Sequence, residues 1–117
     1  MKRTFEEALI NRRSYYNLSS DSPVADYEVV HVLHNAVKHV PSAFNSQTTR
    51  IVLLQGEEHR KLWNIVKETL KKILPEDVYL NTSQKVDHSF ASGHGTILFF
   101  EDTEVVEKFM ATYPLYA

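Results

Sequence analysis

Residues 41–55 read PSAFNSQTTRIVLLQ, a polar loop that leads directly into a short apolar run. The run Ile-Val-Leu-Leu at 51–54 is typical of a strand buried on both faces, so a strand is expected over 50–55. Before the loop, apolar residues recur at helical spacing up to Val40, and Pro41 ends that pattern. The stretch therefore predicts a helix over 26–40, a polar loop and a buried strand in direct succession.

The same hydrophobic period predicts the other elements. Helices are expected at 4–12, 57–74, 81–90 and 103–112, and a second buried strand at 96–100. Two buried strands separated by helices indicate a mixed sheet with both faces covered. Because a sheet of two strands is only marginally stable, further strands should come from a missing segment or a partner chain.

Polar residues mark the expected ends of these helices. Thr4 with Glu7 forms a capping box, Asp26 and Asp102 are expected N-caps, and Gly56 is expected to turn the chain. Apolar side chains of three helices are expected to point inward: Phe5, Ala8 and Leu9 in the first, Val29, Val30, Leu33, Ala36, Val37 and Val40 in the second, and Leu62, Ile65, Val66, Leu70, Ile73 and Leu74 in the third.

The composition limits the class of protein. With 43% hydrophobic and 24% charged residues and no linker-like segment, the 117 residues are expected to form one domain over 1–117. A net charge of -2 disfavours nucleic-acid partners, no apolar stretch is long enough to span a membrane, and the expected location is the cytoplasm. The apolar residues 109–117 indicate either a cut end or a tail packed on the core or on a second subunit.

Several common chemistries lack the residues they need. The six histidines have no metal-binding spacing, and His31 and His34 fall away from the apolar face of their helix, so no metal site is expected. Glycines occur only at 56, 93 and 95 and cannot build a glycine-rich phosphate loop. No Gly-x-Ser-x-Gly nucleophile elbow is present. A metal site, a glycine-rich phosphate loop and a serine-hydrolase elbow are therefore not expected.

Two polar segments could bind a ligand through side chains. Residues 11–16, Asn-Arg-Arg-Ser-Tyr-Tyr, offer two guanidinium groups and a hydroxyl suited to phosphate, although composition alone favours dipole-stabilised cations at a solvated helix end. The loop 41–50 offers amides and hydroxyls that can match the polar edge of a flat heterocycle, and its alternative is an ordinary turn.

Together, these segments resemble the N-terminal half of the nitroreductase family of FMN-dependent oxidoreductases. Arg12-Arg13-Ser14 matches the family's Arg-x-Ser motif, and Pro41-Ser42-x-x-Asn45-x-Gln47 matches its Pro-Ser-x-x-Asn-x-Gln loop. The segments 56–63 and 95–102 are similar to the branch that includes the fatty-acid-repression-mutant-like nitroreductases. The resemblance covers essentially all 117 residues.

The resemblance implies an α+β fold, with a nitroreductase-like mixed sheet flanked by helices, in a homodimer that shares FMN sites at its interface. It implies that Arg12, Arg13 and Ser14 contact the FMN phosphate, ribityl chain or ring edge, and it places Tyr16 where some members have a basic flavin contact. The matching loop residues, which would reach the flavin from the other subunit, are Pro41, Ser42, Asn45 and Gln47. Family members continue well beyond Ala117, so the domain is expected to be incomplete at its C-terminus.

The implied activity is an NAD(P)H oxidoreductase with a ping-pong mechanism. NAD(P)H gives a hydride to the flavin, and the reduced FMN then passes electrons to a nitroaromatic or a quinone. One alternative is a non-catalytic interaction or lipid-signalling module that keeps the fold. A nucleic-acid module using Arg12, Arg13, Lys71 and Lys72 is disfavoured by the acidic charge balance.

Overall fold

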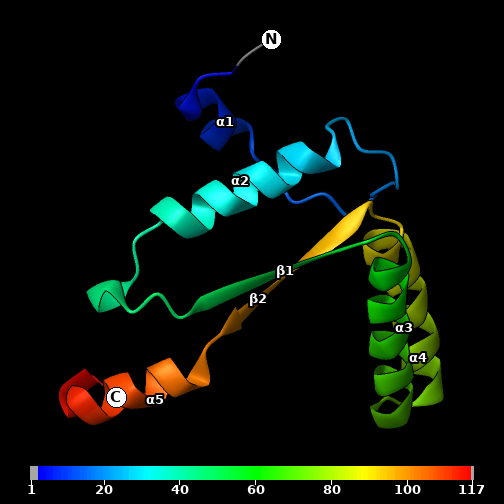
Figure 1. The fold of residues 1–117 in the computed structure, drawn as a ribbon. Coiled ribbons are helices and arrows are strands. Elements are labelled where there is room, and N and C mark those ends of the chain that lie inside the picture. Colours follow the sequence, from blue (N-terminus) through cyan, green and yellow to red (C-terminus); the bar gives the residue numbers. More distant parts are fainter. Residues whose placement is uncertain (1–2, 117) are drawn as a thin grey trace.

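The computed structural model describes residues 3–116, and its helices and strands follow the expected order (Figure 1). Ala117, at the expected incomplete end of the domain, lies outside the described residues. The elements are α1 (Phe5–Asn11), α2 (Asp26–His39), the 3₁₀ turn η1 (Ala43–Asn45), β1 (Thr49–Gln55), α3 (Gly56–Ile73), α4 (Glu76–Val86), the π-helical turn η2 (Asp87–Ala91), β2 (Gly95–Glu101), α5 (Thr103–Thr112) and the 3₁₀ turn η3 (Pro114–Tyr116). The expected α+β class is confirmed.

The two strands form one antiparallel pair. Thr49 lies opposite Glu101 at one end of the pair, and Gln55 lies opposite Gly95 at the other. In Figure 1, α2 lies beside the pair, α3 and α4 stand at its Gln55 end, and α5 leaves from its Glu101 end. The expected mixed sheet is not formed within residues 3–116, because a mixed sheet needs at least one parallel neighbour.

The predicted ends of the helices are correct in three places. Thr4 and Glu7 form the capping box of α1, and the Asp102 side chain accepts a hydrogen bond from the Val105 N–H at the start of α5. Gly56 has a φ of 55°, a left-handed conformation that glycine adopts without strain, and it turns the chain from β1 into α3.

Two expected helix starts are wrong. The N-cap of α2 is Ala25 rather than Asp26, because the Glu28 carboxylate accepts from the Ala25 N–H and the Asp26 side chain bonds elsewhere. The expected helix 81–90 begins earlier, as α4 at Glu76, and then widens into η2. Pro75 precedes that start, since a proline without an N–H group is compatible with a helix N-terminus.

A small buried network ties α3 to β2. The His59 ring, only 3% exposed, has its Nδ1 2.8 Å from the Thr96 hydroxyl and its Nε2 3.1 Å from the Ala91 carbonyl oxygen. The Trp63 Nε1–H donates to the same hydroxyl at 3.0 Å, and the Trp63 ring stacks on Phe90. These partners assign the proton to Nε2 of His59, so that the Thr96 hydroxyl donates to Nδ1.

Most of the expected inward faces are only partly covered. Val86 is the one buried apolar side chain among the described residues, while Phe5 is 84% and Leu9 65% exposed. On α2 and α3 the residues Val29, Leu33, Ala36, Leu62, Val66, Leu70 and Leu74 are half-buried, but Val30, Val37, Val40, Ile65 and Ile73 are exposed. The prediction that both sheet faces are covered is also wrong for this chain, since Phe99 is 68% exposed.

The molecule is an open framework. Its accessible surface is 9882 Å² and its radius of gyration is 18.2 Å. A folded chain of this mass exposes about 6,500 Å², and a compact domain of this length has a radius of gyration of about 13 Å. The exposed apolar faces therefore need a covering that residues 3–116 do not supply.

Candidate functional site

The loop between α2 and β1 has an unusual backbone. Phe44, Asn45 and Gln47 all have left-handed conformations, with φ values of 53°, 56° and 52°. Such a conformation costs roughly 1 kcal/mol or more for a residue with a side chain, and it persists only where surrounding contacts hold it. Residues in this state concentrate at ligand-binding sites, and asparagine tolerates the conformation better than most. The loop is therefore a candidate site on its backbone geometry alone.

Hydrogen bonds between residues close in the sequence hold the interior of the loop. The Ser42 Oγ accepts from the Gln47 N–H at 3.0 Å, and the Ser42 carbonyl oxygen accepts from the Asn45 N–H at 2.9 Å. The Ala43 carbonyl oxygen accepts from the Ser46 N–H at 3.0 Å. Ser42 thus closes the loop from both its backbone and its side chain, which gives a physical role to one of the predicted site residues.

Aromatic side chains anchor the middle of the loop to α5. The Phe44 ring lies 5.4 Å from the Phe109 ring and is stacked on the Tyr113 ring at 5.2 Å, measured between centroids. These three residues line a cavity of about 330 Å³ together with Val106 and Met110. The aromatic contacts offset part of the backbone cost at Phe44.

Arg50 holds the C-terminal end of the loop. Its Nη1 donates to the Gln47 carbonyl oxygen at 2.9 Å and to the Thr49 carbonyl oxygen at 3.2 Å, and its Nη2 pairs with the Asp102 carboxylate at 2.8 Å. The Asp102 N–H in turn donates to the Thr48 carbonyl oxygen at 2.8 Å. Sequence reasoning assigned no role to Arg50 beyond the polar loop, and it treated Asp102 only as a helix cap.

The four predicted loop residues come together in one groove. Pro41, Ser42, Asn45 and Gln47 all line a groove of about 780 Å³ between the end of α2 and the start of β1. Its other lining residues are Ala36, Val37, Lys38, His39, Val40, Thr49, Arg50, Ile51 and Phe99. The volume lies within the range of small-molecule and cofactor sites, and the lining combines apolar walls with a few polar groups.

The second predicted segment lies elsewhere. Arg12 is the C-cap of α1, and the Arg13 guanidinium donates to the Ile10 and Arg12 carbonyl oxygens. Arg12, Arg13, Ser14 and Tyr16 are all exposed, and none of them lines the groove. Figure 1 shows α1 well separated from the loop at η1. Within one chain, the predicted residues therefore form two separate groups.

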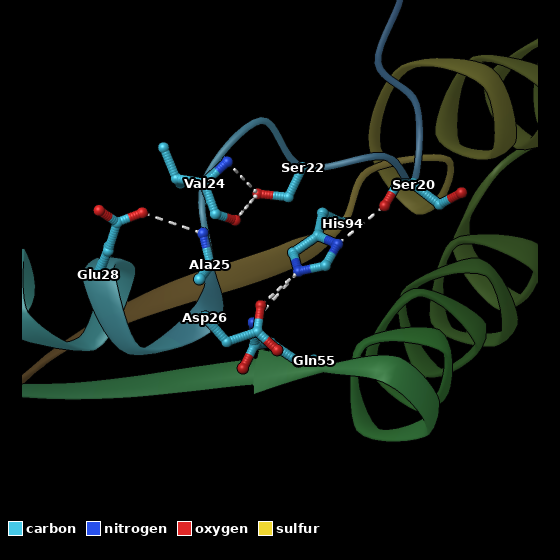
Figure 2. Close-up of polar contacts among 8 residues, drawn as sticks. All are labelled: Ser20, Ser22, Val24, Ala25, Asp26, Glu28, Gln55 and His94. Carbon is cyan, nitrogen blue, oxygen red and sulfur yellow. Dashed lines mark hydrogen bonds and ion pairs between the residues drawn. The ribbon is translucent and has the colours of Figure 1, made fainter.

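A third polar cluster surrounds His94, which lies just before β2, and joins it to Ser20, to Asp26 at the start of α2 and to Gln55 at the end of β1 (Figure 2). His94 donates from Nε2 to the Asp26 carboxylate at 2.7 Å and from Nδ1 to the Ser20 carbonyl oxygen at 2.8 Å. Because both partners are acceptors, the Asp26 carboxylate foremost and the Ser20 carbonyl next, they raise the pKa of His94 above its ordinary value. The hydrogen bond from His94 lowers the pKa of Asp26.

The remaining histidines and helices add no further site. His31 and His34 are exposed on α2, as expected, and His39, which lines the groove, is exposed as well. Within residues 3–116, no three His, Asp or Glu side chains gather closely enough to hold a metal ion. In the same range, no helix is long and apolar enough to cross a membrane.

The family is shown by comparison with known proteins. The model of the nitroreductase family matches residues 9–116, and the chain therefore belongs to this family. It is similar to two nitroreductase-named proteins of Saccharomyces cerevisiae, HBN1 at 34% identity over 116 residues and FRM2 at 29% over 112 residues. These matches cover 97% and 94% of this chain, and the similarity to FRM2, the fatty acid repression mutant protein, confirms the expected branch.

A solved structure confirms the fold. Nitroreductase CinD from Lactococcus lactis, in complex with chloramphenicol, is 37% identical and superposes with a TM-score of 0.74 over 97% of this chain. The same protein in complex with 4-nitrophenol gives a TM-score of 0.69. This chain spans about half the length of the proteins it matches, 56% of HBN1, 54% of FRM2 and 56% of CinD.

Proposed function

We propose that this chain is the N-terminal part of a single nitroreductase-like domain that binds FMN and uses NAD(P)H to reduce nitroaromatics or quinones. The observation that carries the proposal is the groove built on the left-handed loop, in which Ser42, Asn45 and Gln47 share one concave surface. The CinD complexes with chloramphenicol and 4-nitrophenol support nitroaromatic compounds as the substrate class.

The chemistry of the groove fits the polar edge of a flavin ring. Such an edge carries both donors and acceptors, and the side-chain amides of Asn45 and Gln47 each supply both. The groove volume of about 780 Å³ can hold a flat ring system. Pro41 and Phe99 contribute apolar wall to the same groove. Asn45 and Gln47 would therefore orient the ring while the apolar wall excludes water from it.

The second group of predicted residues would hold the phosphate end of FMN. The guanidinium groups of Arg12 and Arg13 and the Ser14 hydroxyl are exposed on consecutive residues after α1. Guanidinium groups bind phosphate through charge-assisted hydrogen bonds. Tyr16, 60% exposed, would contribute a ring and a hydroxyl, but no charge, to the same surface.

The separation of the two groups favours a homodimer. If each FMN lies between two chains, the loop of one protomer faces the Arg12–Ser14 segment of its partner, and neither chain needs to bring both together. The uncovered apolar surface of the chain supports the same arrangement. The flavin site would then be complete only in the assembled protein.

The protein's own contribution is binding and orientation. When bound, FMN supplies the redox chemistry, accepting a hydride from NAD(P)H in one half-reaction and reducing the acceptor in the other. The groove residues would fix the ring edge, and the arginines would fix the phosphate. No side chain of the site is assigned as an acid, a base or a nucleophile. The cytoplasmic location stays a prediction.

Flavin retention tests this proposal directly. Visible absorption spectra are recorded on the purified chain before and after FMN addition and desalting, together with its intact mass. Retention of about one flavin per chain supports the proposal, and both Arg12→Ala and Asn45→Ala should then weaken FMN binding by roughly tenfold or more. Lys71 is exposed on α3, and Lys71→Ala is the matched control that should leave FMN binding unchanged. A colourless chain that binds a partner or acyl chains instead would favour the non-catalytic alternative.

A further inference from the structure

We propose that Arg50 is a positioning residue that holds the loop 41–47 in its ligand-ready shape. In this inference the Arg50 guanidinium ties the left-handed end of the loop to Asp102 at the start of α5, and so fixes how Asn45 and Gln47 face the groove. The inference rests on the proposed function, in which these two amides hold the flavin.

The first step is the geometry of the guanidinium. Arg50 donates to the carbonyl of Gln47, a left-handed residue, and the same planar group pairs with the Asp102 carboxylate at 2.8 Å. Exposed ion pairs contribute little to overall stability because water screens them, and the Arg50 side chain is 54% exposed. Its main effect is therefore on the orientation of the Gln47 peptide rather than on global stability.

The second step is that α5 holds the loop at several points. The Asp102 carboxylate caps α5 through the Val105 N–H while it pairs with Arg50, and the Asp102 N–H donates to the carbonyl of the nearly buried Thr48. The Phe44 ring packs on Phe109 of the same helix. The start of α5 therefore contacts the end of the loop through Asp102, and the body of α5 contacts the middle of the loop through Phe109.

A direct role for Arg50 has to be separated from a positioning role. Arg50 itself lines the groove, so its guanidinium could touch the cofactor, whereas Asp102 does not line the groove. Asp102→Asn removes the charge that orients Arg50 but keeps a good N-cap for α5. A positioning role therefore predicts that Asp102→Asn repeats part of the effect of Arg50→Ala.

The experiment compares four variants of the full chain: Arg50→Ala, Arg50→Lys, Asp102→Asn and Lys67→Ala. Lys67→Ala is the matched control, because it removes an ion pair of similar geometry, Lys67 to Asp87 at 2.6 Å, far from the loop. Amide hydrogen exchange at Gln47 and Asp102 is measured without FMN, FMN affinity is measured by flavin fluorescence, and the melting temperature reports global stability.

The expected pattern separates loop geometry from stability. Arg50→Ala should speed exchange at Gln47 and Asp102 by about tenfold and weaken FMN binding by a similar factor, with little change in melting temperature. Asp102→Asn should also speed exchange at Gln47 and weaken FMN binding. Arg50→Lys should restore only part of each, because the ammonium donors all sit on one nitrogen and cannot span acceptors that the guanidinium reaches from two. Lys67→Ala should change neither.

Three results would overturn the proposal. Unchanged exchange at Gln47 in Arg50→Ala means that the guanidinium does not hold the loop. Weaker FMN binding in Arg50→Ala but not in Asp102→Asn assigns a direct cofactor contact instead. Faster exchange at Gln47 in Arg50→Ala with unchanged FMN affinity means that the shape of the loop does not control FMN binding. A wild-type chain that takes up no FMN overturns the proposed function and the flavin part of the inference, and exchange alone then decides whether Arg50 tethers the loop.

Discussion

Gln47 adopts a backbone conformation that glycine would adopt at lower cost. Gln47→Gly should therefore keep or raise the free energy of unfolding, by up to about 1 kcal/mol, because relief of strain outweighs the added freedom of the unfolded chain. The same change removes the side-chain amide and should weaken FMN binding by about tenfold. Urea unfolding and FMN titration measure the two effects, which should move in opposite directions.

Gln47→Ala is the matched control for this prediction. Alanine removes the amide but keeps the strained backbone, so FMN affinity should fall without any gain in stability. A clear loss of stability in Gln47→Gly would show that the side chain, rather than the surrounding contacts, holds the loop.

The His94–Asp26 pair predicts a pH window for stability. Because the folded-state pKa of His94 is raised, its stabilising effect is complete below the ordinary value of 6.5 and is lost as the pH rises through the folded-state pKa. The pKa of Asp26 is lowered, so its effect is complete above 3.8 and is lost as the pH falls through the folded-state pKa. Stability from the pair should be greatest between those values.

Comparison with His94→Gln isolates this contribution. The difference in unfolding free energy between the wild type and the variant, measured by urea unfolding across pH, should be largest in that window and shrink at higher pH. In an Asp26→Asn background the same difference should shrink, since the carboxylate that interacts with the ring is gone while the Ser20 carbonyl remains. A difference that does not vary with pH would contradict the assigned pairing.

At the scale of the elements, the Thr96 hydroxyl joins β2 to α3. It accepts from the Trp63 Nε1–H and bonds to the buried His59 ring. Thr96→Val keeps the shape and the strand preference but leaves these partners unsatisfied, so it should lower the free energy of unfolding by about 1–3 kcal/mol. Unfolding followed by Trp63 fluorescence measures the change.

Two further threonine variants test whether the hydroxyl is responsible. Thr96→Ser keeps the group and should recover most of the loss. Thr69→Val removes an exposed hydroxyl that bonds only within α3 and should change stability by less than about 0.5 kcal/mol. A large loss in Thr96→Ser with little loss in Thr96→Val would assign the effect to packing of the methyl group instead.

At the scale of the whole molecule, the sequence predicts elements better than it predicts contacts. Local signals such as the apolar run at 51–54 and the cap at Asp102 place the strands and helix ends, because period and capping depend on near neighbours. The pairing of Arg50 with Asp102 joins residues 52 apart, and that of Asp26 with His94 residues 68 apart. No spacing rule links such positions before the fold is known.

In the candidate site, too, the sequence predicts what is local along the chain and does not predict contacts between distant residues. Pro41, Ser42, Asn45 and Gln47, the residues of the family motif, line one groove because they lie on one short segment, and their contact with a flavin stays a prediction. The left-handed backbone at Phe44 was not predicted, because nothing in its residue type favours that conformation. The expected burial of Phe5 and Val30 was wrong, because a hydrophobic pattern indicates which face of a helix is apolar but not what packs against it.

The exposed face of α2 carries the last prediction, which concerns association. Tyr27 and Val30 are 74% and 52% exposed, and with Leu33 and Ile51 they line a groove of about 610 Å³ between α2 and β1. If a second copy covers this face in the proposed homodimer, sedimentation should give a dimer at micromolar concentration. Val30→Glu should then shift the protein toward monomer, because it buries a charge without a partner. Asn64→Glu, on an exposed position of α3, should leave the dimer intact. A dimer insensitive to Val30→Glu would place the interface on a face other than the one around Tyr27 and Val30.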